Sequence, residues 1–148
     1  MTDHSSILDD YIVGFGGFFF KSKDPEALTI WYQKILGFTT QVPYTSDDSA
    51  ISFKWKSFDG ENQNTVWAPF EENTNYFSPS EKEWMINLIV KDIEILLAKL
   101  IAQGVQIIGK IKEAPYGKFA WILDPENNKI ELWEPNRDFF ADKYKANQ

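Results

Sequence analysis

Two copies of one pattern occur in the chain, and this repetition limits its possible folds more than any other feature. The first copy, FFFKSKDPEALTIWYQKILGF, spans residues 18–38, and the second, INLIVKDIEILLAKLIAQGV, spans residues 86–105. Each copy is typical of an apolar strand, then a Lys-Asp pair, then a helix that ends at glycine. Because one unit of this size cannot bury both faces of its sheet, we expect the two copies to pair.

Turn and cap residues divide each half into five elements. Asp24 and Asp92 are candidate helix N-caps, Pro25 fits the first helical position, and Gly104 fits the residue after the second helix. After each helix the sequence gives further strands and a Trp-x-Pro ending. The predicted elements are a strand at 13–22, a helix at 25–36 and strands at 38–43, 50–58 and 64–70, then a strand at 84–90, a helix at 93–103 and strands at 105–112, 117–123 and 129–134.

These elements predict a single domain, 1–148, of the α+β class. Two tandem βαβββ modules, at about 13–70 and 84–135, are joined by the polar linker 71–83. Residues 136–148 form a C-terminal tail that is expected to be a short polar helix or frayed. The helices would cover the outer faces of the sheets, and the inner faces would form one curved, cup-like mixed sheet.

Composition excludes several kinds of chemistry. The chain has no cysteine and one histidine, His4, so disulfides, thiolate nucleophiles and metal sites built on several histidines are excluded. Absence of cysteine fits a cytoplasmic location. The net charge of −7 makes nucleic acid an unfavourable partner and favours a cationic or neutral ligand. No stretch resembles a membrane span or signal peptide. The aromatic content of 16% exceeds what a core requires, so some rings are expected to line a cavity.

The stretch DPENNKIELWEP, at 124–135, predicts a turn followed by an alternating strand. Since side chains alternate along a strand, Glu131 and Trp133 share one face and Ile130 and Leu132 share the other. If Ile130 and Leu132 face a helix, Glu131 faces the inside of the cup. The same parity places Phe19, Met85 and Asn87 on the inner face.

Three stretches resemble one known family: DPEALTIWYQKILGF, VKDIEILLAKLIAQGV and YGKFAWILDPENNKIELWEP. They are similar to the vicinal oxygen chelate superfamily, which includes glyoxalases, bleomycin-resistance proteins and extradiol dioxygenases. The resemblance covers the chain from about Val13 to Pro135. Its most specific part is the concluding Asp-Pro-x-x-Asn-x-x-Glu-Leu motif.

The resemblance also implies where metal ligands would lie. Family enzymes place one ligand near the start of each module and one on each module's last strand. Those positions fall here on Gly17, Met85, Glu131 and either Thr65 or, after a slip of one residue, Val66. With Glu131 as the one ligand retained, we expect no metal and no other cofactor; carboxylates could hold Mg²⁺ or Mn²⁺ only weakly.

Each candidate site residue has a structural and a functional interpretation. Glu131 is either a carboxylate paired with Lys21, Lys118 or Lys129, or a ligand-contacting anion or general base with a shifted pKa. Asn87 is either a polar residue satisfied by backbone or a hydrogen-bond donor to a ligand. The remaining ligand-binding candidates are Phe19, Trp67, Met85, Tyr116 and Trp133, with Trp55, Tyr76 and Trp84 as further rings that could stack on a ligand or pack in the core.

Two functions fit these observations. The first is metal-independent binding of a small planar or cationic molecule in an acidic, aromatic cup, as in bleomycin-resistance proteins. The second is a glyoxalase-like isomerase or lyase with Glu131 as general base, either without metal or with a weakly held divalent metal. A homodimer is expected in either case, because chains of this fold commonly pair.

Overall fold

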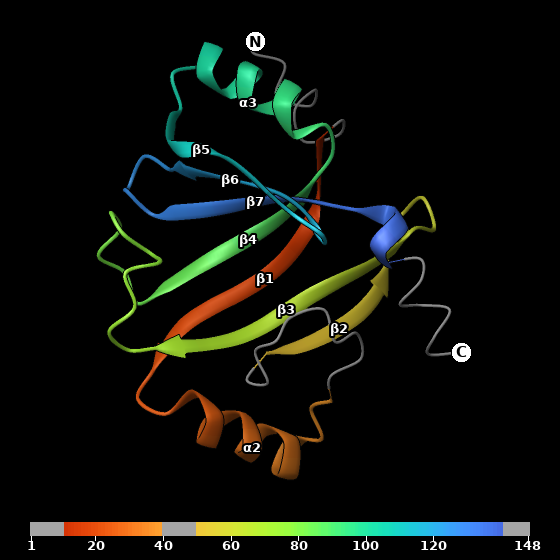
Figure 1. Ribbon diagram of the computed structural model, residues 1–148, viewed down its shortest axis with the longest axis vertical. Coiled ribbons are helices and arrows are strands. Elements are labelled where there is room, and N and C mark those ends of the chain that lie inside the picture. The colour runs from red at the N-terminus through yellow and green to blue at the C-terminus, as the bar shows by residue number, and fades with distance from the viewer. Residues whose placement is uncertain (1–10, 40–49, 141–148) are drawn as a thin grey trace.

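The structure is a computed structural model that describes residues 11–39 and 50–140. It confirms the α+β class, with an open, mixed sheet of seven described strands and the helices α2 and α3 at opposite ends of it (Figure 1). The elements are β1 (Ile12–Ser22), α2 (Pro25–Leu36), β2 (Ile51–Lys56), β3 (Asn62–Glu71), β4 (Trp84–Val90), α3 (Ile93–Ala102), β5 (Gln106–Ala114), β6 (Gly117–Leu123) and β7 (Lys129–Pro135). The strand predicted at 38–43 falls mostly on residues outside the described ranges.

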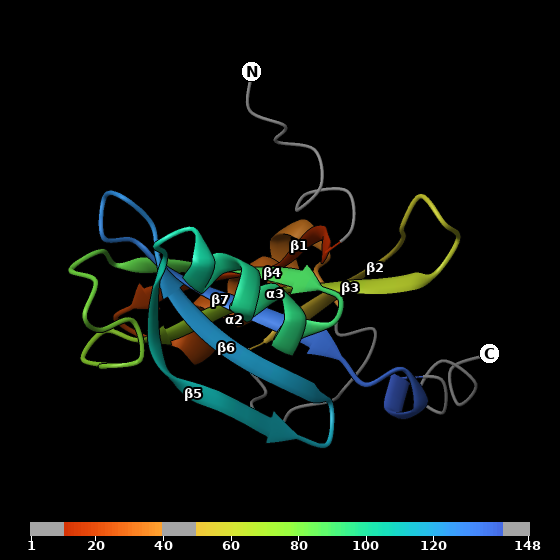
Figure 2. The same cartoon turned by 90° about the horizontal axis from the view of Figure 1, so that it is seen from above.

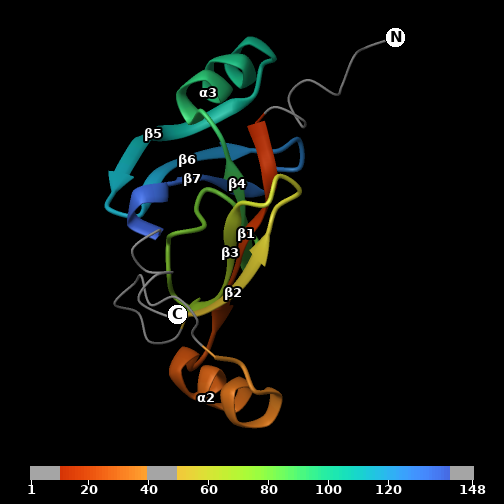
Figure 3. The same ribbon diagram turned by 90° about the vertical axis from the view of Figure 1, so that its right-hand side faces the viewer.

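The strand order β2-β3-β1-β4-β7-β6-β5 confirms the internal repeat. β1 pairs in parallel with β3, β4 pairs in parallel with β7, and the two modules meet where β1 and β4 run antiparallel. Phe18 lies opposite Ile86 in that ladder. Figure 2 shows β5 and β6 bending away from the central strands, and Figure 3 shows the resulting curvature from the side. The two modules thus form one curved sheet.

Helix α2 begins as predicted, but few of its apolar side chains are buried. The Asp24 carboxylate accepts a hydrogen bond from the Ala27 N–H at 3.0 Å, and Gly37, after the helix, has a φ of 73°. The buried residues of the helix are Pro25 and Thr29, whereas Trp31 is 50% exposed. The helix lies beside β3 and β1 at one end of the sheet, so only a narrow side of it is covered.

Helix α3 packs over module two with a different N-terminal contact from the predicted one. Its buried residues Ile93, Leu96 and Leu97 pack in one cluster with Leu132 of β7. The Asp92 side chain makes no capping hydrogen bond. The Glu134 carboxylate accepts the Ile93 N–H instead, at 2.7 Å. The end of β7 therefore fixes the start of α3.

The linker and the tail contribute to the core, although the sequence predicts both as polar. Phe77 of the linker is 1% exposed and packs with Phe19 and Met85 on the inner face. Residues 137–140 are helical, and Phe140 packs against Trp133 with ring centroids 5.7 Å apart. A single apolar residue inside a polar stretch is not part of a helix or strand period. The hydrophobic pattern of the sequence therefore did not predict that Phe77 and Phe140 would be buried.

A bulge at Gly16 brings β1 close to the polar residues of β4. The β1–β4 register shifts between Phe15 and Gly17, so Gly16 is the extra residue. A Cβ atom added there would lie 2.2 Å from the Asn87 Oδ1 and 2.8 Å from the Ile89 Cγ1. Only glycine fits this approach.

We expect Gly16→Ala to lower the free energy of unfolding by about 1–3 kcal/mol, because the added methyl group overpacks the site. Urea denaturation of the variant and the wild type measures this. Gly14→Ala is the milder comparison, since its Cβ would lie 2.9 Å from the Cη2 at the far end of the partly buried Trp55 ring and 3.4 Å from the next atom. Equal losses for the two variants would contradict a specific tight contact at Gly16.

Candidate functional site

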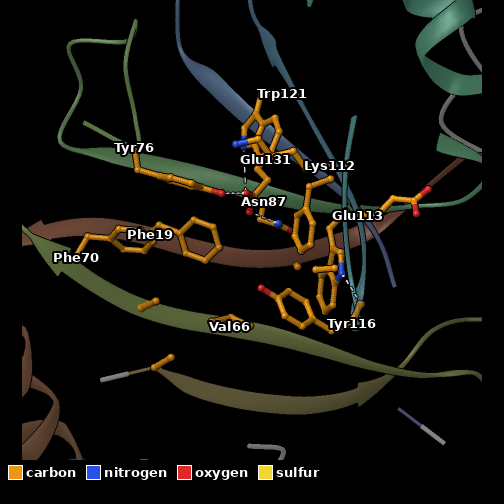
Figure 4. A pocket seen from close by; sticks show the side chains of 16 residues that line it. Phe19, Val66, Phe70, Tyr76, Asn87, Lys112, Glu113, Tyr116, Trp121 and Glu131 are labelled. Atoms are coloured by element: carbon orange, nitrogen blue, oxygen red, sulfur yellow. Dashed lines mark hydrogen bonds between the residues drawn. The ribbon is translucent and has the colours of Figure 1, made fainter. Parts of the chain in front are cut away.

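A cavity of about 360 Å³ lies on the inner face of the curved sheet. Figure 4 shows the rings of Tyr76, Tyr116 and Trp121 around it, with Phe19 of β1 and Val66 of β3 along the other strands. The lining residues are Gly16, Phe19, Ala50, Val66, Ala68, Phe70, Tyr76, Asn87, Lys112, Glu113, Ala114, Tyr116, Phe119, Trp121, Glu131 and Trp133. The interior of the cavity is therefore mostly apolar and aromatic.

The Glu131 carboxylate lies at the polar centre of the cavity and is 2% exposed. Its Oε1 accepts hydrogen bonds from the Tyr76 hydroxyl and, at 3.1 Å, from the Trp121 Nε1. Its Oε2 accepts one from the Asn87 Nδ2 at 2.7 Å. These donors come from the linker, β6 and β4. Three separate segments of the chain thus converge on one carboxylate.

Of the three lysines proposed as partners of Glu131, Lys129 is the one that the structure places with this cluster. Its Nζ donates to the Tyr76 carbonyl at 2.7 Å and lies 5.4 Å and 5.8 Å from the ring centroids of Tyr76 and Trp121. Lys118 instead bonds Glu94 at 2.7 Å. The sequence left Lys129 as one alternative among three, because β-strand parity alone does not show where a long side chain ends.

Burial shifts the pKa values of all three ionisable groups in this cluster. It raises the pKa of Glu131, and the hydrogen bonds from Tyr76, Asn87 and Trp121 and the charge of Lys129 oppose that shift. Burial and the charge of Glu131 together raise the pKa of Tyr76, which therefore stays a hydrogen-bond donor. Burial lowers the pKa of Lys129, although Glu131 acts in the opposite direction.

Asn87 differs from both interpretations suggested by the sequence. Its Nδ2 holds Glu131, so the side chain positions the carboxylate. Its Oδ1 is buried and has no hydrogen-bond partner among the described residues. Since buried polar atoms are normally satisfied, this acceptor is an exception that needs an explanation.

Three of the predicted ligand-binding rings line the cavity: Phe19, Tyr116 and Trp133. Trp133 stacks parallel to Phe119, with an interplanar angle of 4° and centroids 6.2 Å apart, and its Nε1 donates to the Tyr116 carbonyl at 3.1 Å. Met85 is on the inner face but is 0% exposed, within an apolar cluster rather than at the cavity wall.

The prediction that Trp67 faces the cavity is wrong. Trp67 lies opposite Phe18 in the β1–β3 ladder, so it shares the outer face. There its ring packs against Tyr32 of α2, with centroids 4.5 Å apart. Trp133 instead lies opposite Ile89 in the β4–β7 ladder, so the tryptophans of the two Trp-x-Pro endings occupy different positions in their ladders.

The sequence did not single out Phe119 and Trp121, although both line the cavity. They alternate with Ala120 on β6, so the parity that located Glu131 would have located them as well. Tyr76 was open to core packing or to stacking on a ligand, but the linker has no period that could show its hydrogen bond to Glu131.

The residues around Glu131 do not fit the metal site that the family resemblance implies. Val66, the position reached by a slip of one residue, lines the cavity, whereas the Thr65 Oγ1 donates to the Phe15 carbonyl. Gly17 and Met85 offer no ligand atoms. Within residues 11–39 and 50–140, no three His, Cys, Asp or Glu side chains lie close enough together to hold a metal ion.

Comparison with known proteins identifies the family. The model of the Glyoxalase/Bleomycin resistance protein/Dioxygenase superfamily matches residues 19–132, and the chain belongs to this superfamily. No curated protein matches the chain in sequence. Among the described residues, no helix is both long and apolar enough to cross a membrane.

Solved structures show the same fold at low sequence identity. The chain is similar to methylmalonyl-CoA epimerase from Mycobacterium tuberculosis, with 15% identity, a TM-score of 0.56 and coverage of 95% of this chain and 97% of that one. It is also similar to a variant of Streptomyces coelicolor methylmalonyl-CoA epimerase in complex with 2-nitronate-propionyl-CoA, with 15% identity, a TM-score of 0.61 and coverage of 84% and 98%. At these identities the likeness concerns the fold alone.

The raised pKa of Glu131 predicts how stability depends on pH. A carboxyl group whose pKa is higher in the folded state binds more protons there, so its contribution is fully present below the unfolded pKa and is lost as pH rises through the folded pKa. We expect the wild type to lose stability relative to Glu131→Gln as pH rises above about 4.5, the ordinary value. Urea denaturation of both proteins at several pH values measures this. A stability difference that does not change with pH would contradict the shift.

Proposed function

We propose that the chain binds a small planar or cationic molecule in its aromatic cup without a metal ion. The observation that carries this proposal is the buried Glu131 carboxylate at the centre of the cavity, which accepts hydrogen bonds from three protein donors. Within the described part of the chain, it does not belong to a group of side chains that could hold a metal ion. A cavity of about 360 Å³ is within the range of small-molecule sites, which combine apolar walls with a few placed polar groups. Phe119 and Trp133 supply flat apolar surface for a ring.

Glu131 retains capacity for one more contact. A carboxylate oxygen has two acceptor positions. Oε1 already accepts from Tyr76 and Trp121, while Oε2 accepts only from Asn87 among the interactions described above. A ligand donor at Oε2 would complete the coordination of the carboxylate, which supports an anchoring role.

We expect wild-type protein to bind at least one of two planar probes, neutral 2-naphthol and cationic N-methylquinolinium, with an affinity that EDTA does not change. Glu131→Gln should weaken that binding by about 1–3 kcal/mol, because it removes a charge-assisted hydrogen bond while keeping the side-chain shape. Isothermal titration calorimetry measures both. Trp67→Phe is the control, since Trp67 lies on the outer face.

Two outcomes would overturn this proposal. Loss of binding after EDTA treatment, restored by a divalent metal, would show that metal takes part. Unchanged affinity in Glu131→Gln together with a large loss of stability would assign Glu131 a structural role.

An alternative is a glyoxalase-like isomerase or lyase in which Glu131 acts as general base. The observation in its favour is the raised pKa of Glu131, since a base is most effective when its pKa is near the working pH. The three hydrogen bonds weaken this alternative, because they stabilise the carboxylate and reduce its basicity. Similarity in fold to methylmalonyl-CoA epimerases suggests methylmalonyl-CoA as a test substrate. Deuterium uptake from D₂O into it, abolished by Glu131→Gln, would favour the enzyme.

We also propose that the chain forms a homodimer. Large apolar side chains are exposed on α2 and β1, among them Ile35 at 62% and Phe15 at 58%, and exposed apolar patches often mark protein interfaces. Light scattering should give twice the chain mass of 17.2 kDa. A molecular mass equal to that of one chain at micromolar protein concentrations would contradict the dimer.

A cytoplasmic location stays a prediction from composition.

A further inference from the structure

We infer that the cup selects a neutral planar molecule carrying an O–H or N–H donor, and that Lys129 is the residue that disfavours cations. This inference rests on the proposed binding function and narrows its ligand class. It follows from two features of the polar centre: which hydrogen-bonding groups are already used, and which charges are already balanced.

The polar centre offers acceptors to a ligand, and each of the three side chains that contact Glu131 already donates a hydrogen bond to it. The Tyr76 hydroxyl, the Trp121 Nε1 and the Asn87 Nδ2 all donate to Glu131. The Trp133 Nε1 donates to the Tyr116 carbonyl. The acceptor that remains at the carboxylate is the second position of the Glu131 Oε2. The Oδ1 of Asn87, buried and unpartnered within the described residues, adds a second partial negative charge beside it. A ligand that offers only acceptors would leave these atoms unsatisfied and so would bind poorly.

Lys129 already supplies the positive charge that the buried carboxylate needs. Lys129 is 9% exposed and Glu131 is 2% exposed, and the two residues lie on the same face of β7. Tyr76 and Trp121 each contact both of them: their rings lie beside the ammonium group, and their donors reach the carboxylate. Because the two buried charges offset each other, a cationic ligand would add an unbalanced charge to a water-poor site.

The other charged residues at the cavity affect this balance less, although the charge of Lys112 contributes, after burial, to lowering the pKa of Lys129. Lys112 and Glu113 are adjacent, opposite in charge and exposed to solvent, so water screens both. Lys112 also lies over the Trp121 ring, at 5.7 Å from its centroid. It therefore provides a matched control: a second lysine at the same ring, but outside the buried cluster.

The test compares three probes by calorimetry: 2-naphthol, 2-methoxynaphthalene, which lacks the donor, and N-methylquinolinium, a cation. We expect wild type to bind 2-naphthol at least about tenfold more tightly than either of the others, as for other buried charge and donor contacts. Lys129→Met should shift the ratio of cation to naphthol affinity by about tenfold or more toward the cation. Lys129→Arg, which keeps the charge, and Lys112→Met should preserve the wild-type ratio.

The outcomes separate this inference from the proposed function. If no probe binds wild type, the proposed function fails and the inference fails with it. If wild type binds the cation or 2-methoxynaphthalene as well as 2-naphthol, or if Lys129→Met leaves the ratio unchanged, the inference fails while the binding function stands. If Lys129→Met does not fold, Lys129→Gln replaces it, and the same unchanged ratio would overturn the role of Lys129.

Discussion

Burial of the Glu131 carboxylate is the constraint on which the inner face of the protein depends. An ionised carboxylate out of contact with water is strongly unfavourable unless donors and a compensating charge surround it. Here Tyr76, Asn87 and Trp121 donate to it and Lys129 lies behind two of them. Because these residues come from the linker, β4, β6 and β7, their relative positions must all be kept. Through its hydrogen bond with Tyr76, the buried Glu131 carboxylate thus fixes the position of the linker against module two.

The two modules have similar backbone arrangements but contribute different kinds of side chain to the cavity. Phe19 and Asn87 occupy equivalent positions on either side of the centre of the β1–β4 ladder. Their neighbours on the last strand of each module are Ala68 and Glu131. Where module two has a polar residue, module one therefore has an apolar one. Module one supplies a smooth surface against which a flat molecule can lie, and module two supplies the hydrogen bonds.

Sequence periodicity predicted the two modules and several of the residues on the inner face. The repeat located the modules, and parity along β7, β4 and β1 placed Glu131, Asn87 and Phe19 on the inner face, where the structure has them. Features set by register or by single contacts were not predictable in this way. Trp67 was misplaced because ladder register is a tertiary property, and Tyr76 lies in a linker without any period. The hydrogen bond between Tyr76 and Glu131 spans residues far apart in the chain, which no local pattern encodes.

The proposed binding mode differs from what a metal ion in the same cup would select. A bound metal ion is a Lewis acid, so it attracts oxygen atoms that carry electron density. Lys129 offsets the charge of Glu131 from behind the rings of Tyr76 and Trp121 and directs its own hydrogen bond to a backbone carbonyl. The charge of Lys129 favours the ionised form of the carboxylate, against the effect of burial, and the Oε2 has a second acceptor position. In the proposed binding mode the cup accepts a hydrogen bond from its ligand. Fold similarity alone therefore does not transfer the substrate of a relative to this chain.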